Sequence, residues 1–303
     1  MARLFDAYII VDWSAASKPA QGANSIWIGV LARDARLKFH FQAANPSTRL
    51  AARDIIGNLA ERFTSRGDKV LIGFDFSLGY PAGTAKAAGI AKDGEPAWKS
   101  MFGHLSAKLK DKTDNANKRF AIAAGLNYAI SKGPHPFWGA PARDQITTLS
   151  GKKGDFSDSA LPEYRIAETH VRDNFKSKPK SVWQLYGAGS VGSQSLLGIP
   201  TVQALSERLP KSKIWPFETG FQPLGEEALE DTDIVFAEVY PSIVEASPKP
   251  GQVLDEAQVH ALAHHYYTLD EAGKLGALFG PPEGLESTDI AKITTEEGWI
   301  LLK

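Results

Sequence analysis

The segment Ala7-Tyr-Ile-Ile-Val-Asp-Trp-Ser14 is the strongest indication of the fold. Its continuous run of β-branched and aromatic residues predicts a strand covered on both faces. The run ends in Asp12, a carboxylate that is costly to bury unless a cation or a hydrogen-bond donor meets it. Asp12 is therefore either a cap for the following turn or part of a functional site.

The same pattern occurs twice more in the chain. Lys69-Val-Leu-Ile-Gly-Phe-Asp75 and Asp233-Ile-Val-Phe-Ala-Glu238 are also apolar runs that end in an acid. Three strands would thus deliver Asp12, Asp75 and Glu238 from their ends. Clustered carboxylates are the ligands that hard divalent cations prefer, so the recurrence predicts a metal site.

The composition narrows the classes of protein that fit. The 303 residues, 43% hydrophobic and 23% charged, are typical of a globular protein with one large domain or two. No apolar run approaches the roughly 20 residues that cross a bilayer, and the N-terminal segment lacks a secretory pattern. We therefore expect no membrane partner and a cytoplasmic location. The absence of cysteine excludes disulfides and thiolate ligands, so any metal would bind to oxygen or imidazole.

The net charge of −1 conceals an uneven distribution. Residues 81–213 hold 20 Lys and Arg against 11 Asp and Glu, and the rest of the chain holds 14 against 24. A basic middle region of this kind fits an anionic partner, such as a nucleic acid, a nucleotide or a phosphorylated small molecule. A solvated helical surface with interleaved charges is the alternative explanation.

The order of the expected elements predicts the fold class. Strands are expected at Asn24–Ala32 and Arg36–Gln42, followed by a helix from Leu50 to Gly67 and then the strand of Asp75. A meander of three strands, a helix and a further strand, with acids ending the first and fourth strands, predicts an α/β ribonuclease H-like mixed sheet. A dinucleotide-binding sheet fits less well, because no glycine-rich turn leads from the first strand into a helix.

The chain also predicts a large insertion into this core. We expect residues 1–80 and 232–303 to form the core, and residues 81–231 to form a mainly helical insertion on one side of a cleft. Its expected helices are Glu95–Lys110, Asn115–Lys132 and Pro162–Phe175.

Two segments of the insertion could contact a ligand. Arg165 and Glu168 lie on one helix face at i, i+3, either as an ion pair or with Arg165 bound to a ligand phosphate or carboxylate. Gly187-Ala-Gly-Ser-Val-Gly192 satisfies the G-x-G-x-x-G pattern after a possible strand at Val182–Tyr186. Because Gly198 and Pro200 are expected to break the following segment, a turned loop near the site is favoured over a nucleotide-phosphate loop.

A helix is predicted over Asp255–Asp270 near the end of the chain. Asp255 in its first turn is either a metal ligand or an acid favoured by the helix dipole. His260 and His264 are spaced at i, i+4, but no glutamate follows the metalloprotease pattern between them. We interpret them as ordinary helix residues.

Several short motifs resemble a bacterial and archaeal family, domain-of-unknown-function family 429, regarded as having a ribonuclease H-like fold. The motifs are spread over nearly the whole chain and comprise Ile10-Val-Asp12, Gly73-Phe-Asp75-Phe-Ser-Leu-Gly79, Phe137-Trp-Gly139, Tyr164-Arg165 with Glu168, Glu238-Val-Tyr-Pro241 and Glu297-Gly-Trp-Ile300. The resemblance implies that Asp12, Asp75 and Glu238 are strand-end acids of that family and that Asp255 is an acid opening the last helix.

Three functions remain open from the sequence. In the leading hypothesis Asp12, Asp75 and Glu238, with Asp255, hold Mg²⁺ or Mn²⁺ and hydrolyse a phosphodiester, while Arg165 holds substrate phosphate. The second is a nucleotide-dependent phosphotransferase in which Ser14–Ser17 serves as the phosphate loop. The third is a non-catalytic module that binds a small anion.

Overall fold

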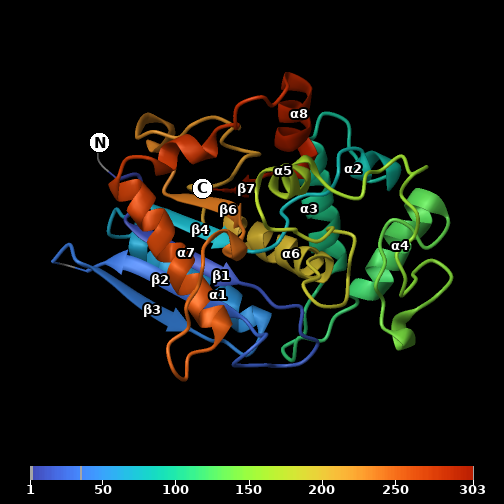
Figure 1. Ribbon diagram of the computed structural model, residues 1–303, viewed down its shortest axis with the longest axis horizontal. Helices are drawn as coiled ribbons and strands as arrows, with labels where there is room; N and C mark the ends of the chain where they lie inside the picture. Colours follow the sequence, from blue (N-terminus) through green and yellow to red (C-terminus); the bar gives the residue numbers. More distant parts are fainter. Residues whose placement is uncertain (1–2, 35, 303) are drawn as a thin grey trace.

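A seven-stranded mixed sheet forms the centre of the computed structural model, which describes residues 3–34 and 36–302 (Figure 1). The strand order is β3-β2-β1-β4-β6-β5, and β7 also pairs with β6. The strands are β1 (Ala7–Asp12), β2 (Trp27–Arg33), β3 (Phe39–Ala44), β4 (Val70–Phe74), β5 (Ser212–Ile214), β6 (Ile234–Val239) and β7 (Ile300–Leu301).

The strand directions explain why acids gather at one edge of the sheet. β1, β2 and β3 form an antiparallel meander, whereas β1, β4 and β6 are parallel neighbours. Parallel neighbours present their carboxyl ends at the same edge, so residues at those ends lie close together although they are distant in the chain. The predicted α/β class with a mixed sheet is confirmed.

Helices cover both faces of the sheet, as the alternation along β1 requires (Figure 1). Ile9 and Val11 belong to one hydrophobic cluster, which includes residues of α1 and α6, whereas Tyr8 and Ile10 belong to a second cluster that includes residues of α7. Both faces of the central strand are therefore buried, as its apolar run predicts. The helices are α1 (Arg49–Thr64), α2 (Thr84–Ala87), α3 (Ala97–Lys108), α4 (Arg119–Ser131), α5 (Ile166–Asn174), α6 (Gly192–Arg208), α7 (Leu254–Glu271) and α8 (Ser287–Lys292).

Short helical turns complete the chain between these elements. Four are 3₁₀ turns and the last is a π-turn. They are η1 (Ala142–Asp144), η2 (Glu227–Leu229), η3 (Pro241–Ile243), η4 (Leu275–Phe279) and η5 (Ile293–Glu297). Within the described ranges, no helix is both long and apolar enough to cross a membrane.

The region expected as an insertion is joined to the core more closely than its helical pattern indicated. β5 lies within residues 81–231 and pairs in parallel with β6, so this region contributes a strand to the main sheet. Leu105 of α3 and Leu126 of α4 share one hydrophobic cluster with Ile56 of α1. Residues 81–231 therefore do not form a separately packed unit.

The helix α6 corrects two expectations about the glycine-rich segment. Val182–Tyr186 is not a strand, because only isolated bridges, such as that between Trp138 and Gln184, form there. α6 then runs for 17 residues with Pro200 inside it. An internal proline costs a helix about 3 kcal/mol, but nearly every apolar side chain of α6 is buried, and this packing maintains the helix.

Candidate functional site

Asp12 and Asp75 lie side by side at the carboxyl ends of two neighbouring parallel strands. Asp12 is the last residue of β1, and Asp75 directly follows β4, whose Phe74 pairs with Val11. The two carboxyl groups share a hydrogen bond. Asp75 also accepts a hydrogen bond of 2.7 Å from the backbone N–H of Trp13. The structure thus brings together two of the acids that the strand pattern indicated.

The environment of this pair disfavours two negative charges. Burial, followed by the charges of Asp75 and Asp255, raises the pKa of Asp12 to about 10. Burial also raises the pKa of Asp75 to about 7, although the N–H of Trp13 and the hydrogen bond from Asp12 act in the opposite direction. The pair therefore retains one proton near neutral pH, as two carboxyl groups in contact do when no cation compensates them.

Asp255 adds a third acid on the other side of the same cavity. It lies in the first turn of α7, and its carboxylate accepts a hydrogen bond of 2.6 Å from the backbone N–H of Asn24. Its charge contributes to the raised pKa values of Asp12 and Asp75. Asp255 thus anchors the loop that precedes β2 and also faces the acid pair.

Glu238 reaches the same edge of the sheet but has a different partner. Its two carboxylate oxygens accept hydrogen bonds of 2.5 and 2.9 Å from the guanidinium of Arg165, and a third of 3.0 Å from the backbone N–H of Leu78. Burial raises the pKa of Glu238, while the guanidinium lowers it. Glu238 is therefore paired with an internal cation, and its role as a metal ligand stays a prediction.

Arg165 is part of the protein framework rather than a group open to ligand. Its side chain is 0% exposed, and it forms ion pairs with both Glu168 and Glu238. Its Nη1 also donates to the backbone carbonyl of Glu297 at 2.7 Å. The i, i+3 pair with Glu168 forms as the helix spacing predicted. The expected contact of Arg165 with a ligand phosphate is not available, because protein acceptors occupy the guanidinium.

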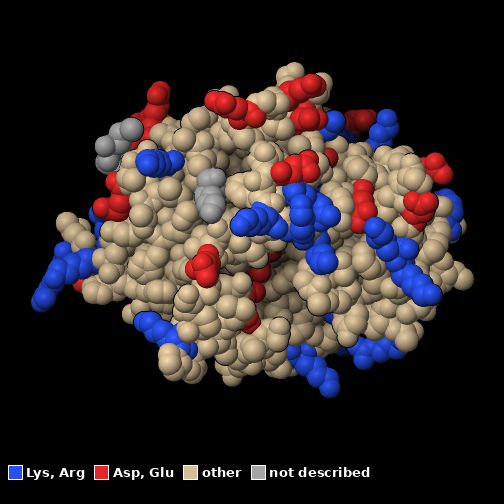
Figure 2. All heavy atoms as spheres, in the orientation of Figure 1, with Lys and Arg blue, Asp and Glu red and all other residues tan. Residues whose placement is uncertain are grey.

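A large cavity opens in front of these acids. It encloses about 970 Å³, and Figure 2 shows a hollow in this face with acidic atoms at depth and basic side chains on its rim. That volume is in the range of pockets that bind small molecules and cofactors. Its charged lining residues are Asp12, Asp75, Arg119, Glu168, Lys178, Lys180, Glu238 and Asp255.

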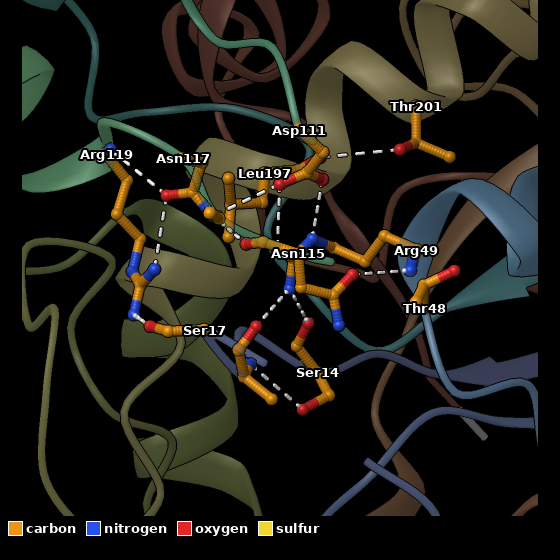
Figure 3. Close-up of polar contacts among 12 residues, drawn as sticks. Ser14, Ser17, Thr48, Arg49, Asp111, Asn115, Asn117, Arg119, Leu197 and Thr201 are labelled. Carbon is orange, nitrogen blue, oxygen red and sulfur yellow. Dashed lines mark hydrogen bonds and ion pairs between the residues drawn. The ribbon is translucent and has the colours of Figure 1, made fainter. Parts of the chain in front are cut away.

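The loop after β1 forms one wall of the cavity and is held from behind by a buried arginine. Ser14, predicted as a substrate contact, lies in the lining with its neighbours up to Ser17. Arg49 donates to the backbone carbonyls of Ser14 and Ala16 at 2.9 and 2.8 Å, and its charge is met by Asp111 (Figure 3). This anchoring fixes the position of the loop beside the acid pair.

Arg119 was not recognised from the sequence, yet it is the buried cation that lines the cavity. It begins α4, is 7% exposed, and donates to Ser193 Oγ at 3.0 Å. It also donates to Asn117 Oδ1 and Ser17 Oγ at 3.2 and 3.1 Å (Figure 3). Among the described residues, no carboxylate lies within ion-pair distance of its guanidinium. The only sequence signal was the basic character of residues 81–213.

The glycine-rich segment lines the same cavity as the acid pair. Residues 187–191 line the cavity and lead directly into α6. Gly187 has a φ of 113°, which favours glycine. A Cβ on Gly192 would lie 2.4 Å from the carbonyl oxygen of Val182, so glycine is also required for close backbone packing. α6 lacks a side-chain N-cap, and its first N–H, that of Gly192, donates to the backbone carbonyl of Gln184 at 2.9 Å.

The four predicted metal ligands are only partly assembled. Within the part of the chain that the structure describes, no three His, Cys, Asp or Glu side chains are grouped as a metal site. Asp12 and Asp75 are in contact, whereas Glu238 is paired with Arg165 and Asp255 binds Asn24. The chemistry of the pair still suits Mg²⁺ or Mn²⁺, because such ions often take only one or two carboxylates together with water and substrate phosphate.

Comparisons of the chain with protein-family models, with curated proteins and with solved structures found no match.

Proposed function

We propose that this protein is a divalent-metal-dependent hydrolase of phosphodiester bonds, with the Asp12–Asp75 pair at its centre. The observation that carries the proposal is the pair itself: two carboxyl groups in contact, on a cavity of about 970 Å³. No basic side chain among the described residues forms an ion pair with either acid. Keeping such a pair uncompensated is costly for folding alone, which favours a role in binding a cation.

Asp12 and Asp75 would hold Mg²⁺ or Mn²⁺, and Asp255 would face the ion from α7. Glu238 is left out of this ligand set because Arg165 occupies it. Bound at the pair, the ion would supply an activated water and stabilise the leaving oxygen of a phosphodiester. The chain itself contributes the orientation of the two carboxylates, through the paired strands and the N–H of Trp13.

The topology is consistent with this reaction class. A three-stranded meander, a helix and a parallel strand, with acids at the ends of β1 and β4, support a ribonuclease H-like fold and the resemblance to domain-of-unknown-function family 429. Fold alone does not determine function, so the site carries the greater weight. We therefore also propose that the chain has the ribonuclease H-like fold and belongs to this family.

The test is hydrolysis of bis(p-nitrophenyl) phosphate with Mg²⁺ or Mn²⁺. Asp12→Asn should lower kcat/KM on the order of a thousandfold, because the variant keeps the shape of the side chain but loses the charge that holds the ion. Asp54→Asn, which removes a carboxylate on exposed α1, is the matched control and should retain full activity. Full activity in Asp12→Asn would overturn the assignment.

A nucleotide-dependent phosphotransferase is the second candidate. The specific observation in its favour is that the G-x-G-x-x-G segment lines the cavity and leads into the 17-residue helix α6. In this case Asp75 would act as the base for an acceptor hydroxyl. Metal-dependent loss of the γ-phosphate of ATP, with no hydrolysis of the diester, would favour it over the first candidate. Binding of anions without turnover in either assay would indicate a non-catalytic module.

A further inference from the structure

The buried guanidinium of Arg119 forms no ion pair with the carboxylates of the described residues, although it lies over the ring of Phe120 and an acid is nearby. The carboxylate of Asp111 accepts from Nε and Nη2 of Arg49 at 2.6 and 2.7 Å, and from the side-chain amide of Asn117 at 3.1 Å (Figure 3). This carboxylate is thus paired with Arg49, and the hydrogen-bond acceptors of Arg119 are neutral oxygens. Burial, and then the charge of Arg49, lower the pKa of Arg119 to about 10, so the guanidinium remains charged at neutral pH.

The guanidinium of Arg119 also keeps donors for a further acceptor. A guanidinium carries five N–H groups, and the three hydrogen bonds of Arg119, one each from Nε, Nη1 and Nη2, leave an N–H on both terminal nitrogens. A buried cation with free donors and no carboxylate partner is unfavourable in a folded protein unless an anion meets it. The position of Arg119 in the cavity lining makes such an anion accessible.

Other donors surround the same part of the cavity. The hydrogen bond from Arg119 Nε to Ser193 Oγ places the guanidinium at the first turn of α6, where the positive end of the helix dipole adds to its charge. The exposed Lys180 also lines the cavity. The guanidinium of Arg119, the first turn of α6 and Lys180 all favour a negatively charged ligand.

This cationic wall is linked directly to the acid pair. Gln194 of α6 donates from its side-chain amide to the backbone carbonyl of Trp13, the residue that follows Asp12. Arg119 donates to Ser17 in the same loop after β1. Residues 13–17 therefore link Arg119 and α6 to the strand that ends in Asp12, and one molecule in the cavity could contact both the acids and Arg119.

We propose that Arg119, with the first turn of α6, forms an anion subsite that binds a second phosphate group of the substrate, apart from the scissile phosphate at Asp12 and Asp75. The assignment to a second phosphate of the substrate rests on the proposed function. The binding of phosphate at Arg119 does not, because it requires neither metal nor the acid pair. The substrate class is a nucleotide-sized molecule that carries two phosphate groups.

The test is a calorimetric titration of the whole protein with inorganic phosphate in the presence of EDTA. Arg119→Gln should weaken binding by about tenfold or more, because charge-assisted hydrogen bonds to phosphate are lost. Arg53→Gln, which removes a positive charge on exposed α1, is the control and should bind as the wild type does. Wild-type protein without phosphate binding, or equal binding in Arg119→Gln, would overturn the subsite.

Two further measurements complete the test. If Arg119→Gln fails to fold, the chemical shifts of the backbone amides of isotope-labelled wild-type protein provide the test instead. On adding phosphate, the largest changes in chemical shift should be those of Ser193 and Gln194. Changes confined to other residues would overturn the subsite. The binding of dimethyl phosphate, which has a single charge, is then compared with the binding of inorganic phosphate. This comparison distinguishes a subsite for a backbone phosphodiester from a subsite for a terminal phosphate monoester. Because EDTA is present throughout, failure here is separate from failure of metal-dependent hydrolysis.

Discussion

The arginines Arg165 and Arg119 are both buried beside the same cavity, but their charges are compensated differently. Arg165 is 0% exposed and meets two carboxylates, those of Glu168 and Glu238. Arg119 is 7% exposed and donates only to neutral oxygens. The acids show the same division, because Glu238 has a cation as partner, while no cation among the described residues pairs with Asp12 or Asp75. The paired groups brace the framework, and we propose that the groups without an ion-pair partner bind the ligand.

Arg165→Met should give the largest loss of stability. Removing the guanidinium leaves Glu168 and Glu238 buried without their cation, and breaking a buried ion pair in this way costs about 3–5 kcal/mol. The free energy of unfolding, measured by urea denaturation near neutral pH, checks this value. Arg53→Met on the exposed surface of α1 is the matched control and should change the free energy of unfolding by less than about 0.5 kcal/mol. A loss below about 1 kcal/mol for Arg165→Met would mean that the cluster is not a structural brace.

Asp12→Asn should have a smaller and opposite effect on the metal-free protein. The pKa of Asp12 rises from 3.8 to about 10, so at low pH both the folded and unfolded states are protonated there and no penalty exists. As the pH rises above 3.8, the unfolded state loses this proton while the folded state retains it, and stability falls until about pH 10. Asparagine does not titrate. The variant should therefore be more stable by about 1 kcal/mol at pH 8.

Thermal or urea unfolding at pH 4 and pH 8 in EDTA measures this difference. The advantage of Asp12→Asn should shrink towards pH 4, because the penalty grows only as the pH rises above the unfolded pKa of 3.8, and pH 4 lies just above that value. Asp54→Asn, an exposed carboxylate, should show no comparable change between the two pH values. A variant that is less stable than the wild type at pH 8 would show that the acid pair contributes to folding instead of opposing it.

The sequence was sufficient to predict the central strands of the fold and the acid pair at their ends. β1, β4 and β6 are buried on both faces, so their apolar runs are unambiguous, and parallel neighbours bring Asp12 and Asp75 together. The helix α7 was also predicted within a residue or so, because its apolar spacing is regular. Local patterns determine elements of this kind.

Contacts between distant residues account for what the sequence did not predict. Arg165 and Glu238 lie 73 residues apart, so no spacing rule indicates that one neutralises the other. Arg119 has no acidic partner because Asp111 pairs with Arg49, and that pairing forms only when the folded chain brings these residues together. α6 continues past Pro200 because the burial of its apolar side chains outweighs the cost of the proline, and helix propensity alone does not include the free energy of that burial.

Calorimetric titration of Mg²⁺ and Mn²⁺ into the wild type and into Asp12→Asn tests the central claim most directly. If the uncompensated acid pair is a cation site, the wild type binds at least one of the two ions, and Asp12→Asn loses that binding while remaining folded. Arg119→Gln should still bind the metal. No binding by the wild type, or equal binding by Asp12→Asn, would contradict the claim.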